Sequence, residues 1–169
     1  MRIAIMRHGP AEDYSATGRD HDRPLTPSGR QRVRQVAEAL AGAGEAPRVL
    51  LTSPLVRARE TADEVGAALR RALRLPGEVP IVVRAELSPG RDQLGLVREL
   101  FAAGDDNAVL VGHEPDLSEL VAHLSGRPPS GMLKAMVASF ELVADPERRG
   151  GYRSEVRFIL DPKTLVFAR

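Results

Sequence analysis

The chain begins Met1-Arg2-Ile3-Ala4-Ile5-Met6-Arg7-His8-Gly9-Pro10, and this stretch carries the clearest structural signal among its 169 residues. An apolar run, from Ile3 to Met6, stops abruptly at the tetrapeptide Arg7-His8-Gly9-Pro10. A short apolar run that ends at glycine and proline is typical of a buried strand leading into a loop. We therefore expect a first strand whose C-terminal end delivers Arg7 and His8.

Downstream of this strand, predicted helices alternate with predicted strands. Apolar runs indicate strands at 48–52, 80–83 and 108–111. Apolar residues at helical spacing form four stripes: Val33, Val36, Ala37 and Leu40; Leu55, Ala58, Ala62, Val65 and Leu69; Leu94, Val97, Leu100 and Phe101; Leu117, Leu120, Val121 and Leu124. Each stripe is typical of a helix that packs one face against a core.

The expected helix starts carry capping signals. Thr26-Pro27 and Ser53-Pro54 each place a capping hydroxyl before a proline that suits the first helical turn. Asp116 and Glu119 have the spacing of a capping box. The polar segment 11–23 has no clear period, and we expect it to be a surface loop.

The last third of the chain differs from the rest, since it predicts strands at 136–143, 155–160 and 165–167 with no helix between them. Strands that alternate with helices predict a mainly parallel sheet, and a closing meander adds antiparallel strands. We therefore expect a single domain over residues 1–169, with an α/β fold. Its architecture would be a three-layer α/β/α sandwich with a mainly parallel sheet and antiparallel strands at the C-terminal end.

Composition narrows the function classes. The chain has 24 basic and 23 acidic residues and a net charge of +1, which argues against a nucleic-acid or membrane partner. It contains no cysteine, which excludes disulfides and thiolate chemistry. The N-terminal apolar run is too short for a signal peptide, and no apolar stretch approaches the roughly 20 residues that cross a bilayer. We therefore expect a cytoplasmic protein.

Two histidines and two arginines are predicted to meet at one edge of the sheet. His8 follows the first predicted strand, His113 follows the fourth, and Arg57 lies in the first turns of the helix after the second. Ligands of open parallel sheets bind where such strand ends gather. With Arg7 and a helix N-terminus nearby, the arrangement predicts an anion-binding site.

Several motifs occur in an order that resembles the histidine phosphatase superfamily, which includes the cofactor-dependent phosphoglycerate mutases. They are Arg7-His8-Gly9, the segment from Ser53 through Arg57 to Thr61, and Gly112-His113. More narrowly, Asp22-Arg23-Pro24-Leu25-Thr26 with Gly29, and Glu86-Leu87-Ser88-Pro89-Gly90, resemble the short SixA-type phosphohistidine phosphatases. The resemblance runs from Met1 to about Gly126, and the tail after Arg127 matches no motif.

The resemblance implies a phosphoglycerate mutase-like fold and a defined chemistry. His8 would attack phosphorus and become a phosphohistidine, which water then hydrolyses. Arg7, Arg57 and His113 would hold the phosphoryl oxygens, so the reaction would need no metal and no cofactor. Glu12 and Asp13 lie near His8, but they lack the tight ligand spacing of a metal motif.

Two glutamates compete for the role of general acid. Glu86 occupies the place where the mutase branch of the superfamily carries its proton donor. Glu114 directly follows His113, as the acid of the acid-phosphatase branch does. We favour Glu86 as the general acid. If the substrate is a phosphohistidine, the acid would matter little, because imidazole is already a fair leaving group.

The substrate expectation rests on size. Residues 86–106 offer no long insertion that could cover a small metabolite. An open rim suits a phosphohistidine displayed on another protein, so a SixA-type protein phosphohistidine phosphatase is the leading hypothesis. Its alternatives are a phosphatase for small phosphorylated metabolites and, from another class, a non-enzymatic phosphate-binding module.

Overall fold

The computed structural model of the chain describes residues 1–148 and 150–168. The single domain expected over 1–169 therefore includes two positions, Arg149 and Arg169, that lie outside the described residues. In chain order the elements are β1 (Arg2–Arg7), a 3-10 helix η1 (Asp20–Asp22), α1 (Pro27–Gly42), β2 (Val49–Thr52), α2 (Val56–Leu73), β3 (Ile81–Val83), a 3-10 helix η2 (Ala85–Leu87), α3 (Gln93–Ala103), β4 (Ala108–Gly112), α4 (Asp116–Ser125), β5 (Val137–Ala144), β6 (Tyr152–Leu160) and β7 (Phe167–Ala168).

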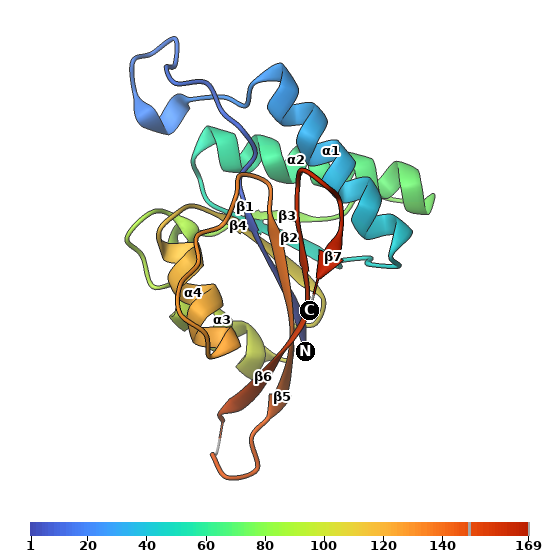
Figure 1. Cartoon of the computed structure of the whole chain (residues 1–169), viewed down its shortest axis with the longest axis vertical. Coiled ribbons are helices and arrows are strands. Elements are labelled where there is room, and N and C mark those ends of the chain that lie inside the picture. The colour runs from blue at the N-terminus through green and yellow to red at the C-terminus, as the bar shows by residue number, and fades with distance from the viewer. Residues whose placement is uncertain (149, 169) are drawn as a thin grey trace.

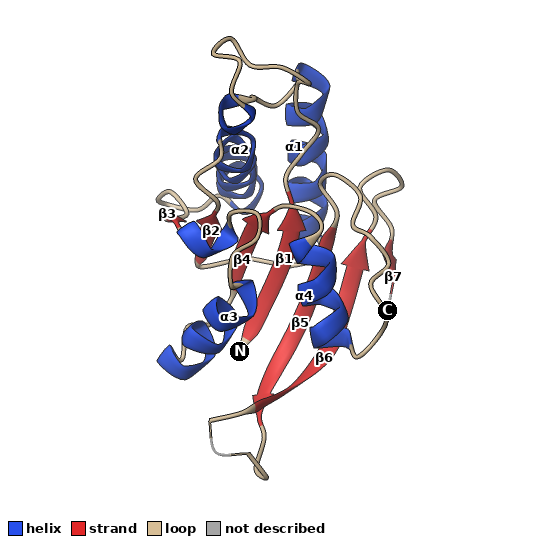
Figure 2. Cartoon of the chain, turned by 90° about the vertical axis from the view of Figure 1, so that its left-hand side faces the viewer, coloured by secondary structure: helices blue, strands red, loops and turns tan. Residues whose placement is uncertain are grey.

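All the strands belong to one seven-stranded sheet of order β3-β2-β4-β1-β5-β6-β7. The first four strands are parallel, and β5, β6 and β7 each pair antiparallel with their predecessor in that order. The predicted mixed sheet, with antiparallel strands at its C-terminal end, is therefore confirmed. Figure 2 shows the ends of β1 and β4 next to each other in the middle of the sheet.

Helices cover both faces of the sheet, with α1 and α2 on one side and α3 and α4 on the other (Figure 1). Two apolar clusters fill the spaces between the layers. One combines stripe residues of α1 and α2 with strand residues such as Met6 and Val111, and the other combines α3 and α4 with residues such as Ile5 and Leu110. The expected three-layer α/β/α sandwich is confirmed, because alternate residues of the central strands point to opposite cores.

The first predicted helix cap is confirmed, and the two others are wrong, although α4 does begin at Asp116. Thr26 caps α1, since its hydroxyl accepts the Gly29 N–H at 2.9 Å. The helix expected after Ser53-Pro54 begins only at Val56 and has no side-chain cap. Asp116 does not form a capping box either, because its carboxylate accepts the N–H of Gly90.

The last two strands differ from their predicted bounds. β6 begins at Tyr152 rather than at 155, so its hairpin with β5 is longer than expected. β7 covers only Phe167–Ala168, because Leu165 adopts a left-handed conformation with φ of 57° and belongs to the preceding turn. The expected loop 11–23 is also less irregular than predicted, since it contains η1. Within the described part of the chain, no helix combines the length and the apolar character that a membrane span requires.

Candidate active site

Two imidazoles meet at the carboxyl edge of the sheet. In the parallel register of β1 and β4, Arg7 pairs with Gly112. The residue that directly follows each strand is a histidine. The ring centroids of His8 and His113 lie 5.1 Å apart, and the ring planes are tilted by 51°. Both residues are buried, with 7% and 2% of their surface exposed. Strand register alone therefore brings together two residues that are far apart in the sequence.

The hydrogen bond at Nδ1 of His8 defines which nitrogen is free to react. Nδ1 lies 2.7 Å from the carbonyl oxygen of Gly9. A carbonyl only accepts, so Nδ1 carries the proton and donates it. In the neutral ring, the lone pair is then on Nε2, which is the atom available for nucleophilic attack.

The backbone after His8 is fastened to α2. The Gly9 N–H donates to the Thr61 hydroxyl at 3.0 Å, and that hydroxyl donates to the Arg57 carbonyl at 2.7 Å. A Cβ at position 9 would lie 2.6 Å from Cγ2 of Val33, so the close packing of this turn requires glycine. The threonine of the second motif thus links the loop after His8 to the helix that carries Arg57.

Both histidines are held in the neutral form. Burial, together with the positive charges of Arg57 and Arg7, lowers the pKa of His8 from 6.5 to about 4. Burial likewise lowers the pKa of His113 to about 3, with contributions from His8 and Arg57. Neutral imidazole is the nucleophilic form, so at neutral pH His8 is ready to react.

Each of the two arginines has a buried Nε that finds no partner among the described residues. Arg7 donates from one terminal nitrogen to the Met132 carbonyl at 2.6 Å, while its buried Nε has no partner among the described residues. The buried Nε of Arg57 is likewise without a partner in that part of the chain. Buried polar groups are nearly always hydrogen-bonded in folded proteins. A phosphoryl group at this edge would satisfy both guanidinium groups with charge-assisted hydrogen bonds.

Ser53 positions the second histidine instead of capping a helix. Nε2 of His113 and Oγ of Ser53 share a hydrogen bond of 2.9 Å. The same hydroxyl accepts the Leu55 N–H at 3.3 Å, a weak contact within the turn that precedes α2. The serine of the second motif therefore acts on His113, which explains why the predicted helix cap is absent.

Glu86 and Glu114 have different surroundings. The Glu86 carboxylate pairs with Arg84 at 2.8 Å, and this hydrogen-bonded pair lowers the pKa of Glu86. Glu114 accepts a hydrogen bond from the Ser118 hydroxyl, and its Oε1 is buried with no partner among the described residues. The role of Glu86 as the proton donor stays a prediction, and its ion pair with Arg84 favours the ionised carboxylate.

One residue at the site was not recognised from the sequence. Asp20, on η1, accepts two hydrogen bonds from Arg57, to its carbonyl oxygen at 2.8 Å and to Oδ2 at 3.1 Å. Its Oδ1 also accepts from Arg23 at 2.8 Å. Nothing in the polar segment 11–23 distinguishes Asp20 from its neighbours, because its contact with Arg57 exists only in the folded chain.

The segment after Gly131 also contributes to the site, although it matches no sequence motif. The Ala135 N–H lies 3.1 Å from the carbonyl oxygens of both Arg7 and His8. The Met136 carbonyl accepts the N–H of Arg7 at 3.1 Å. The backbone at Arg7 and His8 is therefore held by a segment of the C-terminal third.

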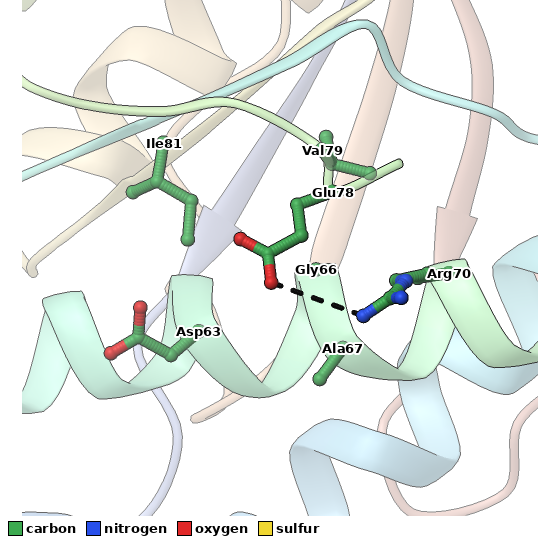
Figure 3. Close-up of a pocket in the computed structure, with 7 residues that line it drawn as sticks. All are labelled: Asp63, Gly66, Ala67, Arg70, Glu78, Val79 and Ile81. Carbon is green, nitrogen blue, oxygen red and sulfur yellow. Dashed lines mark ion pairs between the residues drawn. The ribbon is translucent and has the colours of Figure 1, made fainter. Parts of the chain in front are cut away.

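A separate cavity of about 200 Å³ lies between α2 and the β3 edge of the sheet. Figure 3 shows Asp63 and Arg70 of α2 facing Glu78 and Ile81 across it. The Arg70 and Glu78 side chains approach to 3.9 Å and are well exposed, so this ion pair contributes little. None of its lining residues belongs to the histidine and arginine cluster. Among the residues that the structure describes, no three His, Cys, Asp or Glu side chains gather as a metal site.

Comparisons with known proteins agree with this geometry. The sequence profile of the histidine phosphatase superfamily (branch 1) matches residues 3–87. A protein of Picosynechococcus sp. is 41% identical over 123 residues, which cover 70% of each chain. Phosphohistidine phosphatase SixA of Escherichia coli is 34% identical over 147 residues, which cover 84% of this chain and 86% of the relative.

The fold comparison extends to almost the whole chain. The structure of the protein histidine phosphatase SixA complexed with tungstate superimposes with a TM-score of 0.80 and 32% identity, covering 98% of this chain and 100% of the other. The similarity thus includes the C-terminal strands, beyond the segment that the family profile matches. The chain belongs to the histidine phosphatase superfamily.

Proposed function

We propose that this phosphatase removes the phosphoryl group from a phosphohistidine on a partner protein, through a covalent intermediate on His8. The observation that carries the proposal is the state of His8. Its pKa of about 4 and its Nδ1 contact with Gly9 leave a neutral ring with a free Nε2. That atom lies in a cluster with His113, Arg7 and Arg57, which are suited to hold phosphoryl oxygens.

The first step forms a bond between Nε2 of His8 and phosphorus, and breaks the bond between phosphorus and the substrate's imidazole nitrogen. The departing imidazole takes a proton from solvent and leaves neutral. Arg7, Arg57 and His113 would hold the equatorial oxygens while negative charge redistributes over them. Because two positive guanidinium groups are built into the site, this charge is stabilised by the chain's own residues.

In the second step water attacks the phosphorus of the phosphorylated His8. The bond from phosphorus to Nε2 breaks, inorganic phosphate leaves with the oxygen of water, and the ring of His8 returns to its neutral form. The low pKa of His8 supports this return, since the regenerated imidazole does not stay protonated at neutral pH.

Two observations support a protein as the substrate. Two relatives that are 34% and 32% identical to this chain are SixA proteins. Their names specify phosphohistidine phosphatase or protein histidine phosphatase activity. In this chain, the connection between β3 and α3 consists of η2 and a short turn. Such a short connection leaves room at the rim for a phosphohistidine carried on a protein surface.

The test uses a peptide phosphorylated on histidine with ³²P. Wild-type protein should release labelled phosphate, and rapid quenching should trap the label on the protein. His8→Asn should abolish both, because asparagine keeps the size of the side chain but cannot accept the phosphoryl group. His123→Asn is the matched control, since His123 lies on the exposed side of α4.

Each alternative function has its own outcome in this experiment. Turnover of small phosphorylated metabolites without turnover of the peptide would identify a metabolite phosphatase. Binding of tungstate without turnover of any phosphate compound would identify a phosphate-binding module. Label transfer to wild type and to His8→Asn alike would refute the covalent role of His8.

A further inference from the structure

A cavity of about 350 Å³ adjoins the active site on the side of α1 and the C-terminal turn. Arg7 lines it, so the cavity shares a wall with the proposed phosphoryl site. Its other charged lining residues are Arg32, Lys134 and Lys163, and its apolar walls are Pro10, Leu133 and Pro162. Both lysines of the whole chain thus line one cavity.

These four cations are not neutralised within the part of the chain that the structure describes. None of them lies within ion-pair distance of a carboxylate there, whereas arginines elsewhere, such as Arg84 and Arg157, pair with glutamates. The carboxylate beside Lys163 is that of Asp161, which accepts the backbone N–H groups of Lys163 and Thr164. A chain with a net charge of +1 therefore concentrates unpaired positive charge at one place.

The backbone next to Lys134 is fixed against the active site. Ala135 is buried and adopts a left-handed conformation with φ of 68°, and its N–H contacts the carbonyls of Arg7 and His8. A left-handed alanine is strained and persists only where surrounding contacts maintain it. The charge of Lys134 contributes to the lowered pKa of His8, which agrees with a position near the nucleophile.

The opposite wall is assembled from α1 and the turn before β7. The Arg32 side chain donates to the carbonyl of Pro162, and this contact joins α1 to the turn that carries Lys163. Three parts of the chain that are distant in sequence therefore build the cavity around Arg7. This construction points to a binding site rather than to a chance arrangement of surface charges.

We propose that this cavity binds a second anionic group, a carboxylate or a phosphate, that the substrate carries beside the phosphoryl group transferred to His8. Arg32, Lys134 and Lys163, which lack carboxylate partners among the described residues, match such a group, while Arg7 lies between it and the phosphoryl site. The apolar walls match an aliphatic stem. The inference rests on the proposed function. On a protein substrate the second anion would be an acidic side chain next to the phosphohistidine.

The test measures binding without turnover, using pairs of phosphonates that differ only in a terminal carboxylate. The pairs are ethylphosphonate with phosphonoacetate, propylphosphonate with 3-phosphonopropionate, and butylphosphonate with 4-phosphonobutyrate. In at least one pair, calorimetric titration of wild type should show about tenfold tighter binding of the carboxylated member, as hydrogen bonds to a charged group predict. The combined variant Lys134→Gln with Lys163→Gln should reduce this ratio to below about threefold.

The ratio of the two affinities within a pair distinguishes a loss of carboxylate recognition from a general loss of binding. A purely structural role of the lysines would weaken both members of a pair equally and leave the ratio intact, which would overturn the inference. So would a ratio near one at every chain length in wild type. Arg71→Gln, which removes an exposed positive charge at the far end of α2, is the matched control and should leave the ratio unchanged.

Two phosphohistidine peptides identify the source of the second anion. One carries glutamate beside the phosphohistidine and the other carries glutamine. Wild type should prefer the glutamate peptide, and the double lysine variant should lose this preference. If wild type prefers the carboxylated phosphonates but does not prefer the glutamate peptide, the second anion is not an acidic side chain next to the phosphohistidine. Failure to hydrolyse either peptide would refute the proposed function, while the phosphonate ratios would still decide on the cavity.

Discussion

Arg57 donates two hydrogen bonds to Asp20, at 2.8 Å to the carbonyl oxygen and at 3.1 Å to the carboxylate. The arginine is 5% exposed, whereas the Asp20 side chain is 66% exposed. The carboxylate of Asp20, in the segment after β1, thus accepts a hydrogen bond from the guanidinium group that we expect to hold the phosphoryl group. A phosphate bound by Arg57 would compete with this carboxylate for the same donor.

This competition predicts that Asp20→Asn binds oxyanions more tightly. Removal of the negative charge weakens the contact between residue 20 and Arg57, and exposed ion pairs of this kind contribute up to about 1 kcal/mol, or about fivefold in affinity. The inhibition constant of tungstate against p-nitrophenyl phosphate hydrolysis measures the change. Asp22→Asn is the control, because Asp22 lies on the same 3-10 helix but contacts His21 and Thr17. Weaker binding in Asp20→Asn would show instead that Asp20 positions Arg57.

The buried histidines predict a loss of stability in mild acid. Their pKa values are lowered from 6.5 to about 4 for His8 and about 3 for His113, so below pH 6.5 the unfolded chain binds more protons than the folded chain. The free energy of unfolding should therefore fall as the pH falls from 6.5 toward 4, by up to about 1.4 kcal/mol per pH unit for each histidine. Above about pH 7.5, where the unfolded histidines are also neutral, both contributions are constant.

Urea unfolding between pH 7 and pH 4.5 checks this slope. Carboxylates with lowered pKa, such as that of Asp106, add to the slope only below about pH 5, where the unfolded chain begins to protonate them, so the histidine slope is read above about pH 5.5. His8→Gln should show about half of the wild-type slope, since one of the two buried imidazoles is gone. His123→Gln, at an exposed position of α4, should keep the full slope. Equal slopes in all three proteins would contradict neutral, buried histidines.

A metal-independent reaction is the third prediction. Arg7, Arg57 and His113 are expected to supply the electrostatic stabilisation that metal ions supply in many other phosphatases. Hydrolysis of p-nitrophenyl phosphate should therefore continue in excess chelator and should be inhibited by tungstate or vanadate. Activity that disappears in chelator and returns with added zinc or magnesium would contradict the prediction.

The sequence predicted those features that depend on local pattern and on strand ends. His8 and His113 could be placed together because both follow buried strands, and Arg57 because it follows another. Asp20 and Lys134 could not, because their roles come from contacts across the folded chain, such as the Ala135 N–H to the carbonyls of Arg7 and His8. Tertiary contacts also explain the wrong helix cap, since the Ser53 hydroxyl bonds to His113.

The identity of the general acid is the fourth prediction. Glu86→Gln should slow the hydrolysis of alkyl phosphates such as phosphoethanolamine by about 10²-fold or more, because general acid catalysis typically contributes about 10²- to 10⁴-fold. The effect on p-nitrophenyl phosphate and on phosphohistidine should be much smaller. Their leaving groups depart without strong need of a proton. Glu114→Gln should be nearly silent.

Arg84 provides the decisive second variant, because its hydrogen bonds to Glu86 hold the carboxylate ionised and lower its pKa. Arg84→Gln removes that charge, so the pKa of Glu86 rises and a larger fraction carries the proton at neutral pH. If Glu86 is the acid, Arg84→Gln should speed the hydrolysis of alkyl phosphates and extend their activity to higher pH, and the double variant with Glu86→Gln should lose this gain. A strong effect of Glu114→Gln, with Glu86→Gln silent, would move the acid to the residue beside His113. If neither substitution changes the rate for any leaving group, the site lacks a dedicated general acid. A phosphoramidate substrate can be hydrolysed without such an acid, whereas an alkyl phosphate needs one.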